Sequence, residues 1–431
     1  MTNNINQEKN GFYGLGIAPK FFEILDELNF TVPTPIQVKS IPVAIEGKDL
    51  VGIAQTGTGK TLAFGVPMLQ RLAQNGGRGL VIIPTRELAL QVNEHLTMIG
   101  RKLGLRTAVL IGGETINKQF AALRRKPHII VATPGRLIDH LGRKTVDLSA
   151  VKILVLDEAD MMFDMGFAPQ IREILKAVPK KRQTMLFSAT MPPEIMNIAA
   201  REMALPVRIE VAPAGTAAAG VTQEMIIVNV EDKFAQVEKI LVKHTGPVLV
   251  FTRTKHGAKN LCRKLRQIGH KSAEIHSNRS LAQRREALDG FKIGKFRILV
   301  ATDIAARGID VSGIELVLNY DLPEQAEDYV HRIGRTARAG RTGVAISLAL
   351  PAQLAAIKKI EKTINKTIPQ TRLAAFPDNG ISSIFNRNRL KFSHHRQTRE
   401  AGQSRANQPK FNRNIARRRR SFSTGSVRPK R

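Results

Sequence analysis

The chain has 431 residues and carries 67 Lys or Arg against 36 Asp or Glu, a formal net charge of +31 at pH 7. At about 150 residues per domain this length predicts two or three domains, and an apolar content of 42% is enough to form their cores. So large a positive charge predicts a polyanionic partner, with nucleic acid ahead of a membrane surface. The single cysteine, Cys262, excludes an internal disulfide and fits a reducing compartment.

The first residues give no sign of export. Residues 1–10 are polar and lack the apolar core of a secretory signal. No stretch approaches the roughly 18 consecutive apolar residues of a membrane span. We therefore expect a soluble, cytoplasmic protein that does not bind membranes.

Short apolar runs alternate with helix-length stretches in the first half of the chain, a pattern that predicts an α/β domain with a parallel sheet. This domain is expected to span residues 1–211. Residues 212–220 are small and contain Pro and Gly, which predicts a linker. The predicted strands are Asp49–Ala54, Gly79–Pro84, Thr107–Ile111, His128–Ala132, Lys152–Asp157, Thr184–Ser188 and Val207–Val211.

A second series of apolar runs has the same rhythm without repeating the residues of the first. It predicts a second α/β lobe, over residues 221–368, and a cleft between the two lobes. The predicted strands are Glu224–Val230, Pro247–Thr252, Ser272–His276, Phe296–Ala301, Leu316–Tyr320 and Gly343–Leu350.

Residues 369–431 are expected to form a disordered basic tail. From Arg387 onward, fifteen Lys or Arg face one acid, Glu400. Such a segment buries too little apolar surface to offset its chain entropy. We interpret it as an arm that binds phosphates without regard to sequence; a localisation signal at Arg417–Arg420 is the alternative.

A glycine-rich loop follows the first predicted strand and precedes a helical stretch, Leu62–Ala73. Residues 54–61 read Ala-Gln-Thr-Gly-Thr-Gly-Lys-Thr, with Ala54 where the general phosphate-loop pattern has Gly. In such a loop Lys60 reaches the terminal phosphates and the Thr61 hydroxyl ligates magnesium. The backbone that cradles the phosphates comes from Thr56, Gly57, Thr58 and Gly59. A glycine turn with an incidental Lys-Thr pair is the alternative.

The apolar run from Val151 to Leu156 stops at three carboxylates, Asp157, Glu158 and Asp160. Ligands bind at the carboxyl ends of buried parallel strands. Asp157 is therefore a candidate magnesium partner and Glu158 a candidate base for a water that attacks phosphate. An acidic helix N-terminus is the structural alternative. Together with the phosphate loop, these acids predict a nucleotidase.

Two further motifs complete a family pattern: Ser188-Ala-Thr190, and residues 331–338, His-Arg-Ile-Gly-Arg-Thr-Ala-Arg. With the loop and the Asp-Glu-Ala-Asp run, the chain resembles DEAD-box ATP-dependent RNA helicases over residues 12–365, most similarly the bacterial RhlE type. The resemblance implies two RecA-like lobes, ATP and Mg²⁺ as cofactors, and RNA as partner. It further implies local unwinding of short RNA duplexes, in a setting such as ribosome assembly or RNA decay and with protein partners from it.

The resemblance also implies roles for single residues in nucleotide binding. Gln37 would read adenine, whose edge offers a donor and an acceptor that an amide can match, while Phe30 would stack on the base with Phe12 behind it. Asp310 would contact the ribose. Two arginines, Arg335 and Arg338, would reach the triphosphate from lobe two and neutralise charge that develops during phosphoryl transfer.

For RNA, the resemblance assigns backbone contacts, which do not read sequence, to loops of both lobes. Asp160, Ser188, Thr190 and His331 would couple the acids to the RNA surface. Three positions depart from the family pattern: Ser277 and Ala337 stand where Gly is usual, and Leu281 where Gln is usual. The implied RNA-binding residues are Arg86, Gly113, Thr133 and Arg136 in lobe one and Arg253, Arg284 and Thr302 in lobe two.

The distribution of these motifs predicts a mechanism. The phosphate loop and acids lie in lobe one and the arginines in lobe two, so closure on ATP and RNA must assemble the hydrolytic site. An ATP-gated RNA clamp that does not unwind, and a DNA helicase or translocase, are the alternative functions. The sequence does not indicate which RNAs are bound.

Overall fold

The computed structural model describes residues 11–55, 57–211, 220–306, 311, 313–337 and 342–372. These residues belong to one compact unit and contain two seven-stranded sheets in which every paired strand is parallel. The predicted α/β class with two parallel-sheet lobes is therefore confirmed. Thr56, Asp310, Arg338, nearly all of the predicted linker and the predicted basic tail lie outside the described residues.

The sheet of lobe one has the strand order β3-β4-β2-β5-β6-β1-β7. Its central strands are buried on both faces, which explains why they read as continuous apolar runs. The strands are β1 Leu50–Ile53, β2 Arg78–Ile82, β3 Thr107–Leu110, β4 Ile129–Ala132, β5 Val151–Leu156, β6 Gln183–Ser188 and β7 Val207–Glu210.

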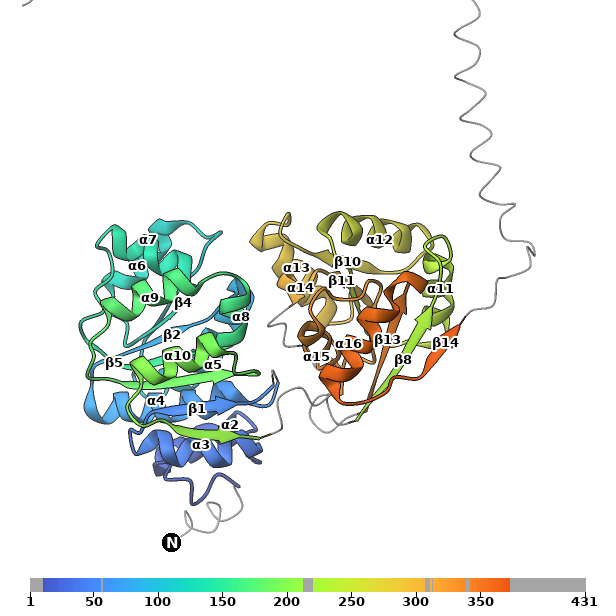
Figure 1. Cartoon of the computed structure of the whole chain (residues 1–431). Helices are drawn as coiled ribbons and strands as arrows, with labels where there is room; N and C mark the ends of the chain where they lie inside the picture. The colour runs from blue at the N-terminus through green and yellow to red at the C-terminus, as the bar shows by residue number, and fades with distance from the viewer. Residues whose placement is uncertain are drawn as a thin grey trace, which may run out of the picture. The chain divides into compact units, whose positions relative to one another are not determined.

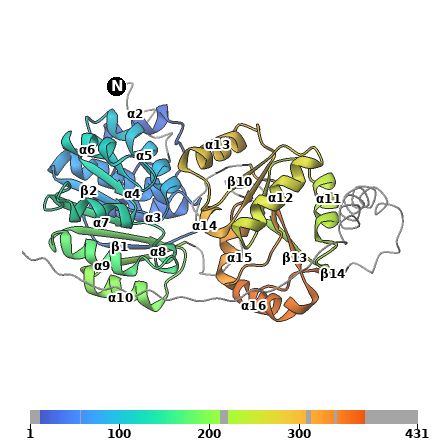
Figure 2. The same cartoon turned by 90° about the horizontal axis from the view of Figure 1, so that it is seen from above.

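Helices cover both faces of this sheet; in Figure 2, α4 and α5 lie on one side of it and α9 and α10 on the other. The helices are α2 Pro19–Glu27, α3 Pro35–Ile45, α4 Lys60–Asn75, α5 Arg86–Arg101, α6 Ile116–Arg124, α7 Pro134–Gly142, α8 Ala159–Asp164, α9 Ala168–Ala177 and α10 Pro193–Glu202.

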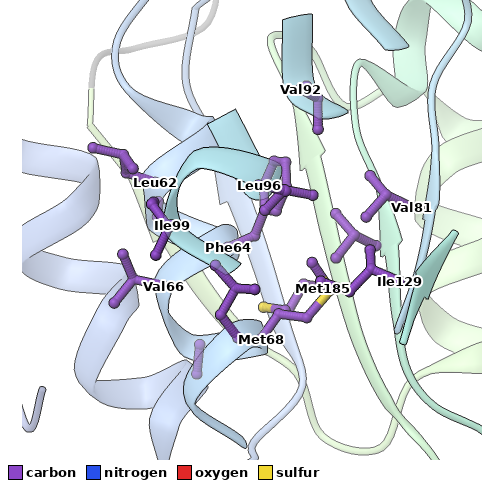
Figure 3. Packing of buried hydrophobic residues seen from close by; sticks show 14 of the residues in the cluster. Leu62, Phe64, Val66, Met68, Val81, Val92, Leu96, Ile99, Ile129 and Met185 are labelled. Carbon is purple, nitrogen blue, oxygen red and sulfur yellow. The ribbon is translucent and has the colours of Figure 1, made fainter. Parts of the chain in front are cut away.

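The core beneath α4 fixes the start of that helix, and with it the phosphate loop. Phe64 of α4 packs on Phe187 of β6 with 5.6 Å between ring centroids, and both side chains are fully buried. Truncating either ring to alanine would cost about 3–5 kcal/mol. Figure 3 shows the surrounding contacts, which come from α4, α5 and the sheet: Leu62, Val66, Met68, Val81, Val92, Leu96, Ile99, Ile129 and Met185.

Lobe two, drawn from green-yellow to red in Figure 1, repeats this architecture. Its strand order is β10-β11-β9-β12-β13-β8-β14. The strands are β8 Val221–Ile227, β9 Val248–Phe251, β10 Ser272–Ile275, β11 Ile298–Ala301, β12 Leu316–Asn319, β13 Gly343–Ala349 and β14 Gln370–Arg372. The helices are α11 Lys233–Lys243, α12 Lys255–Gln267, α13 Leu281–Lys292, α14 Asp303–Ala306, α15 Ala326–Ile333 and α16 Leu354–Ile364, with a short 3₁₀ turn at Pro351–Gln353.

Each of the thirteen predicted strands is present within a few residues of its expected bounds. The end of lobe two at residue 368 is wrong, because β14 pairs with β8 through Gln370 and Met225 and extends the sheet to Arg372. Gln-Thr-Arg has no apolar alternation to mark it as a strand. The other domain bounds stay predictions.

Two further features of the fold concern Cys262 and the length of the helices. Cys262 is 1% exposed and packs in the core under α12, as a small apolar residue does. None of the helices in the described ranges is long and apolar enough to cross a membrane.

Candidate nucleotide and RNA site

The glycine-rich loop has a backbone that only glycine adopts easily. Gly57 and Gly59 have φ angles of 86° and 92°, and a Cβ on Gly59 would collide with the amide of Gln37. α4 begins directly after Gly59, at Lys60. The loop therefore presents its backbone at a helix N-terminus, the geometry that favours an anion.

Gln37 joins α3 to this loop. Its Oε1 accepts the N–H of Thr34 at 2.9 Å, and its Nε2 donates to the carbonyl of Gly59 at 3.0 Å. Oε1 keeps a second lone pair and Nε2 a second hydrogen. The amide thus retains one acceptor and one donor position, which is what an adenine edge requires.

A cavity of about 300 Å³ connects the adenine residues with the phosphate loop and the acids. Among its lining residues are two aromatic rings, Phe12 and Phe30, as well as Gln37. The structure therefore brings together the described nucleotide residues predicted in lobe one, except Thr58, whose hydroxyl donates to the carbonyl of Gln55 at 2.7 Å. The phosphate loop and the acids contribute Gly57, Gly59, Lys60, Thr61, Asp157 and Glu158 to the lining.

Three charged side chains are buried at the floor of this cavity. The Nζ atom of Lys60 lies 2.8 Å from Oε1 of Glu158 and 4.0 Å from Oδ1 of Asp157, and each of the three side chains is no more than 4% exposed. Lys60 also donates to the carbonyl of Ala54 at 3.2 Å. Two carboxylates and one ammonium leave an excess of one negative charge when all are ionised.

The two acids respond differently to this burial. Burial raises the pKa of Asp157 to about 7, because Lys60 is too far away to offset the lost hydration. Burial also opposes ionisation of Glu158, but the charge and hydrogen bond of Lys60 outweigh it and hold the pKa of Glu158 at about 2. Glu158 is thus ionised and tied to Lys60, while Asp157 is the acid short of a cation.

The turn that carries these acids is strained. Glu158 has φ 54° and ψ 51°, the left-handed region, immediately after β5 and before α8. A non-glycine residue there costs on the order of 1–3 kcal/mol, and such strain gathers at functional sites. The turn places the Glu158 carboxylate on Lys60, while its own N–H donates to Oδ1 of Asp157 at 3.0 Å.

The donors at this floor fit a magnesium ion. Thr61 offers a hydroxyl and Asp157 a carboxylate that lacks a close cation, and both line the same cavity. Mg²⁺ takes one or two protein oxygens and completes its shell with water and substrate phosphates. Within the described residues, no group of three His, Cys, Asp or Glu could hold a metal without such additional ligands.

Asp160 connects the acids to the end of β6. Its Oδ2 accepts the N–H groups of Ala189 and Thr190 at 3.1 and 2.8 Å, and the Thr190 hydroxyl at 3.0 Å. The N–H of Asp160 donates to the Ser188 hydroxyl at 3.1 Å. The predicted coupling residues of lobe one therefore form one hydrogen-bonded cluster across two adjacent strands.

A second cavity, of about 450 Å³, is lined by arginines. Arg86 reaches it from the start of α5 and Arg136 from α7, where Nη1 of Arg136 donates to the carbonyl of Glu114 at 3.2 Å. Gly113 lies against the Arg86 guanidinium, where a Cβ would collide. Thr133 also lines the cavity. The four predicted RNA residues of lobe one are thus gathered in one place.

The predicted RNA residues of lobe two are less concentrated. Arg284 lines the same cavity and donates to Glu87 of α5 at 2.8 Å; burial lowers the pKa of Arg284. Arg253 and Thr302 are not part of this lining. Arg253 has an exposed side chain, and Thr302 is half-buried at the end of β11.

Sequence reasoning missed Arg332, a buried side chain of lobe two with four hydrogen bonds. Its guanidinium donates to both carboxylate oxygens of Asp303 at 2.5 and 2.7 Å, to Oδ1 of Asn319 at 3.1 Å and to the carbonyl of Asp321 at 2.6 Å. It also lies 5.0 Å from the centroid of the Phe251 ring. Arg332 thus fastens α15 to the ends of β9, β11 and β12.

This fastening sets the position of the arginine motif. Arg335 follows Arg332 by one turn, is 3% exposed, and donates from Nε to the carbonyl of His331 at 3.1 Å. After burial and Lys60, the charges of Arg335 and His331 are the next influences on the pKa of Glu158, and both lower it. The described part of the arginine motif is therefore close enough to act on the acids electrostatically.

Comparison with known proteins finds helicase similarity over most of the chain. The model of the DEAD/DEAH box helicase family matches residues 34–198, and that of the helicase conserved C-terminal domain matches residues 232–340. The chain is 44% identical over 358 residues to the ATP-dependent RNA helicase CshA of Listeria monocytogenes, covering 82% of this chain and 69% of that protein.

Two further similarities come from yeasts. The chain is 41% identical over 366 residues to the ATP-dependent rRNA helicase RRP3 of Yarrowia lipolytica, covering 84% of this chain and 76% of the other. Its structure is similar to S. cerevisiae Dbp5 bound to RNA and ADP BeF3, with a TM-score of 0.76, 30% identity and coverage of 85% and 95% of the two chains. The predicted RhlE type is not confirmed by these relatives.

Proposed function

The chain belongs to the DEAD-box family of ATP-dependent RNA helicases, and we propose that its residues divide this activity between a lobe that performs the chemistry and a lobe that completes it. ATP enters the cavity of lobe one, with adenine between Phe30 and Gln37 and the phosphates at Gly57, Gly59 and Lys60. The proposal rests on one observation above all, the buried pair that Lys60 makes with Glu158 at 2.8 Å.

This ion pair would keep the enzyme inactive in hydrolysis until ATP binds. While Lys60 holds Glu158, the carboxylate is a weak base, because its pKa is low and its lone pairs face an ammonium. Phosphates bound at the loop compete for Lys60, and Glu158 is then able to accept a proton from the attacking water. Arg335 neutralises charge that develops on the transferred phosphoryl group, and we assign Arg338 and Asp310 the parts implied by the family resemblance.

Magnesium would be held by Thr61 and Asp157. Bound there, it would supply positive charge against the phosphates beside Asp157, whose Oδ1 lies 4.0 Å from the Lys60 ammonium. Asp157 must be deprotonated to bind the ion. Because the pKa of Asp157 is raised, binding of the ion itself would promote the loss of that proton.

RNA binding is proposed for the arginine-lined cavity and the strand ends next to it. Arg86, Arg136 and Arg284 offer guanidinium groups to backbone phosphates, and we assign Gly113, Thr133, Arg253 and Thr302 to the same path. Contacts of this kind position the strand without specifying its sequence. Asp160, Ser188, Thr190 and His331 would transmit the nucleotide state to this path.

The cellular setting is proposed on more general grounds. A single buried, unpaired cysteine fits the cytoplasm. The two named relatives act on RNA or rRNA by their names, which supports roles in ribosome assembly or RNA decay and protein partners from those pathways. The basic residues from Arg387 onward would add an RNA-binding arm of low specificity.

Two assays on the full chain test this function. We expect ATPase activity to be stimulated by single-stranded RNA and much less by single-stranded DNA, and we expect ATP-dependent displacement of a short RNA strand from a duplex with an overhang. Equal stimulation by DNA would contradict the RNA assignment. Stimulated ATPase with no strand displacement would show an ATP-gated clamp and overturn local unwinding.

A further inference from the structure

α12 carries positive charge along its outer face and no acid anywhere. Its thirteen residues contain five Lys or Arg and no Asp or Glu. The opposite face is apolar and buried against β10 and β11 through Ala258, Leu261, Cys262 and Leu265. The neighbouring α13 carries Glu286 and Asp289 and α16 carries Glu361, so an unbroken basic face is particular to α12 in this part of lobe two.

Three of these cations lie in one row. Lys255, Lys259 and Arg263 are spaced four residues apart, about 6 Å along the helix axis at each step, and therefore project from the same side. All three are exposed. Within the described residues, none of them forms an ion pair, whereas the flanking Lys264 lies 5.2 Å from the Phe234 ring centroid and Arg266 donates to the carbonyl of Ser272 at 2.9 Å.

The row begins beside the residues already assigned to RNA. His276, just after β10, has a pKa lowered first by burial and then by the charges of Arg284, His256, Lys255 and Lys259. Lys255 and Lys259 of the α12 row and Arg284 of the cavity therefore all lie close enough to His276 to act on its charge. The two acids on this path are already paired, Glu87 with Arg284 at 2.8 Å and Glu274 with Arg279, so they leave the cations of α12 unopposed.

We propose that the outer face of α12 binds the phosphate backbone of duplex RNA adjoining the strand that is bound in the arginine-lined cavity. A row of cations with regular spacing and no partner fits a polyanion of regular spacing. α12 has no Phe, Tyr or Trp on which the base of an unpaired strand could stack. Double-stranded RNA is recognised by shape, through phosphates and 2′-hydroxyls.

The outer face of α12 would hold the part of the duplex that is not yet separated, which the arginine-lined cavity alone does not do. An enzyme that separates a duplex while holding one strand must keep the remaining duplex in place. A basic helix outside the strand path would hold that duplex by contacts that do not depend on sequence. The inference adds a second RNA surface to the activity and leaves the nucleotide site as described above.

The test compares two triple variants of the full chain. Lys255→Gln, Lys259→Gln and Arg263→Gln remove the α12 row; Lys358→Gln, Lys359→Gln and Lys362→Gln remove three exposed charges from α16 as a matched control. Binding constants are measured between 50 and 200 mM salt for a blunt RNA duplex, a duplex with a single-stranded overhang, and a single strand. Thermal melting confirms that both variants fold.

We expect the α12 variant to bind both duplexes about tenfold more weakly than the α16 control, and to lower the log–log salt slope for duplex by about 2–3, since each lost phosphate contact removes about 0.9. Both variants should bind the single strand alike. An equal loss on single strand and duplex would overturn the duplex assignment in favour of a single-strand path. Duplex binding equal to that of the control would overturn RNA binding by α12 altogether and leave a protein surface. Either failure is distinct from loss of RNA-stimulated ATPase, which tests the proposed function.

Discussion

The two lobes share a fold but treat the charges at the ends of their strands in opposite ways. In lobe one, Lys60, Asp157 and Glu158 are buried with an excess of acid, a raised pKa on Asp157 and a strained backbone at Glu158. In lobe two, Arg332 uses its guanidinium donors on Asp303, Asn319 and a backbone carbonyl. In lobe one the two buried acids outnumber the lysine between them, whereas in lobe two the Arg332 guanidinium makes four hydrogen bonds.

This difference separates binding from positioning. A buried site with a net negative charge is stabilised by a ligand that brings positive charge. Its side chains are therefore the ones whose contacts and protonation change when ATP and Mg²⁺ bind. A network whose donors already have acceptors is stabilised little by a ligand, and it holds its neighbours in fixed places. We infer that lobe one responds to the nucleotide, and that lobe two presents Arg335 from a rigid support.

The largest effect is expected from Glu158→Gln. The change keeps the shape of the side chain and removes the proposed base, so kcat for ATP hydrolysis should fall at least about 100-fold, the lower end of general-base contributions. ATP and RNA binding should persist, because Lys60 remains free to bind phosphate. Stopped-flow binding of a fluorescent ATP analogue and steady-state ATPase measure the two quantities. An active variant would remove Glu158 from its role.

Arg332→Met tests whether the network of lobe two is a support. The variant leaves Asp303 without its partner, and we expect a loss of about 3 kcal/mol in the free energy of unfolding, at the low end for buried pairs because Asp303 is 23% exposed. Thermal and urea unfolding measure it. Arg332→Lys is the control: it keeps a charge but loses the forked contact to Asp303. A stable Arg332→Met variant with reduced ATPase would instead place Arg332 in the chemistry.

The fold was largely predictable because its strands are buried on both faces. Such strands read as short apolar runs, and thirteen of them were found from the pattern alone. β14 was missed because an edge strand of three polar residues has no such pattern; its place depends on pairing with β8, about 145 residues earlier in the chain.

The nucleotide site was predictable for a related reason. Asp157 and Glu158 follow directly after β5, Lys60 follows β1 after the glycine-rich loop, and the carboxyl ends of parallel strands meet at one edge. Arg332 was not predictable, because an arginine in an amphipathic helix is expected to be exposed. Its burial depends on Asp303 and Asn319, which lie 29 and 13 residues away in the chain.

The smallest effect is expected from Thr190→Val, which tests how lobe one passes its response to RNA. Valine has the shape of threonine but removes the hydroxyl bond to Asp160, while the backbone bonds of Ala189 and Thr190 remain. The free energy of unfolding should fall by about 1 kcal/mol. Strand displacement should fall more than RNA-stimulated ATPase, because Asp157 and Glu158 keep their positions while Asp160 loses one hydrogen bond to the residues after β6. Thr184→Val is a matched control within β6, the strand that leads to Thr190, since the Thr184 hydroxyl is buried without a hydrogen-bond partner in the described part of the chain. Equal losses in displacement and ATPase, or the same behaviour in Thr184→Val, would show that Thr190 supports the strand and does not couple the two activities.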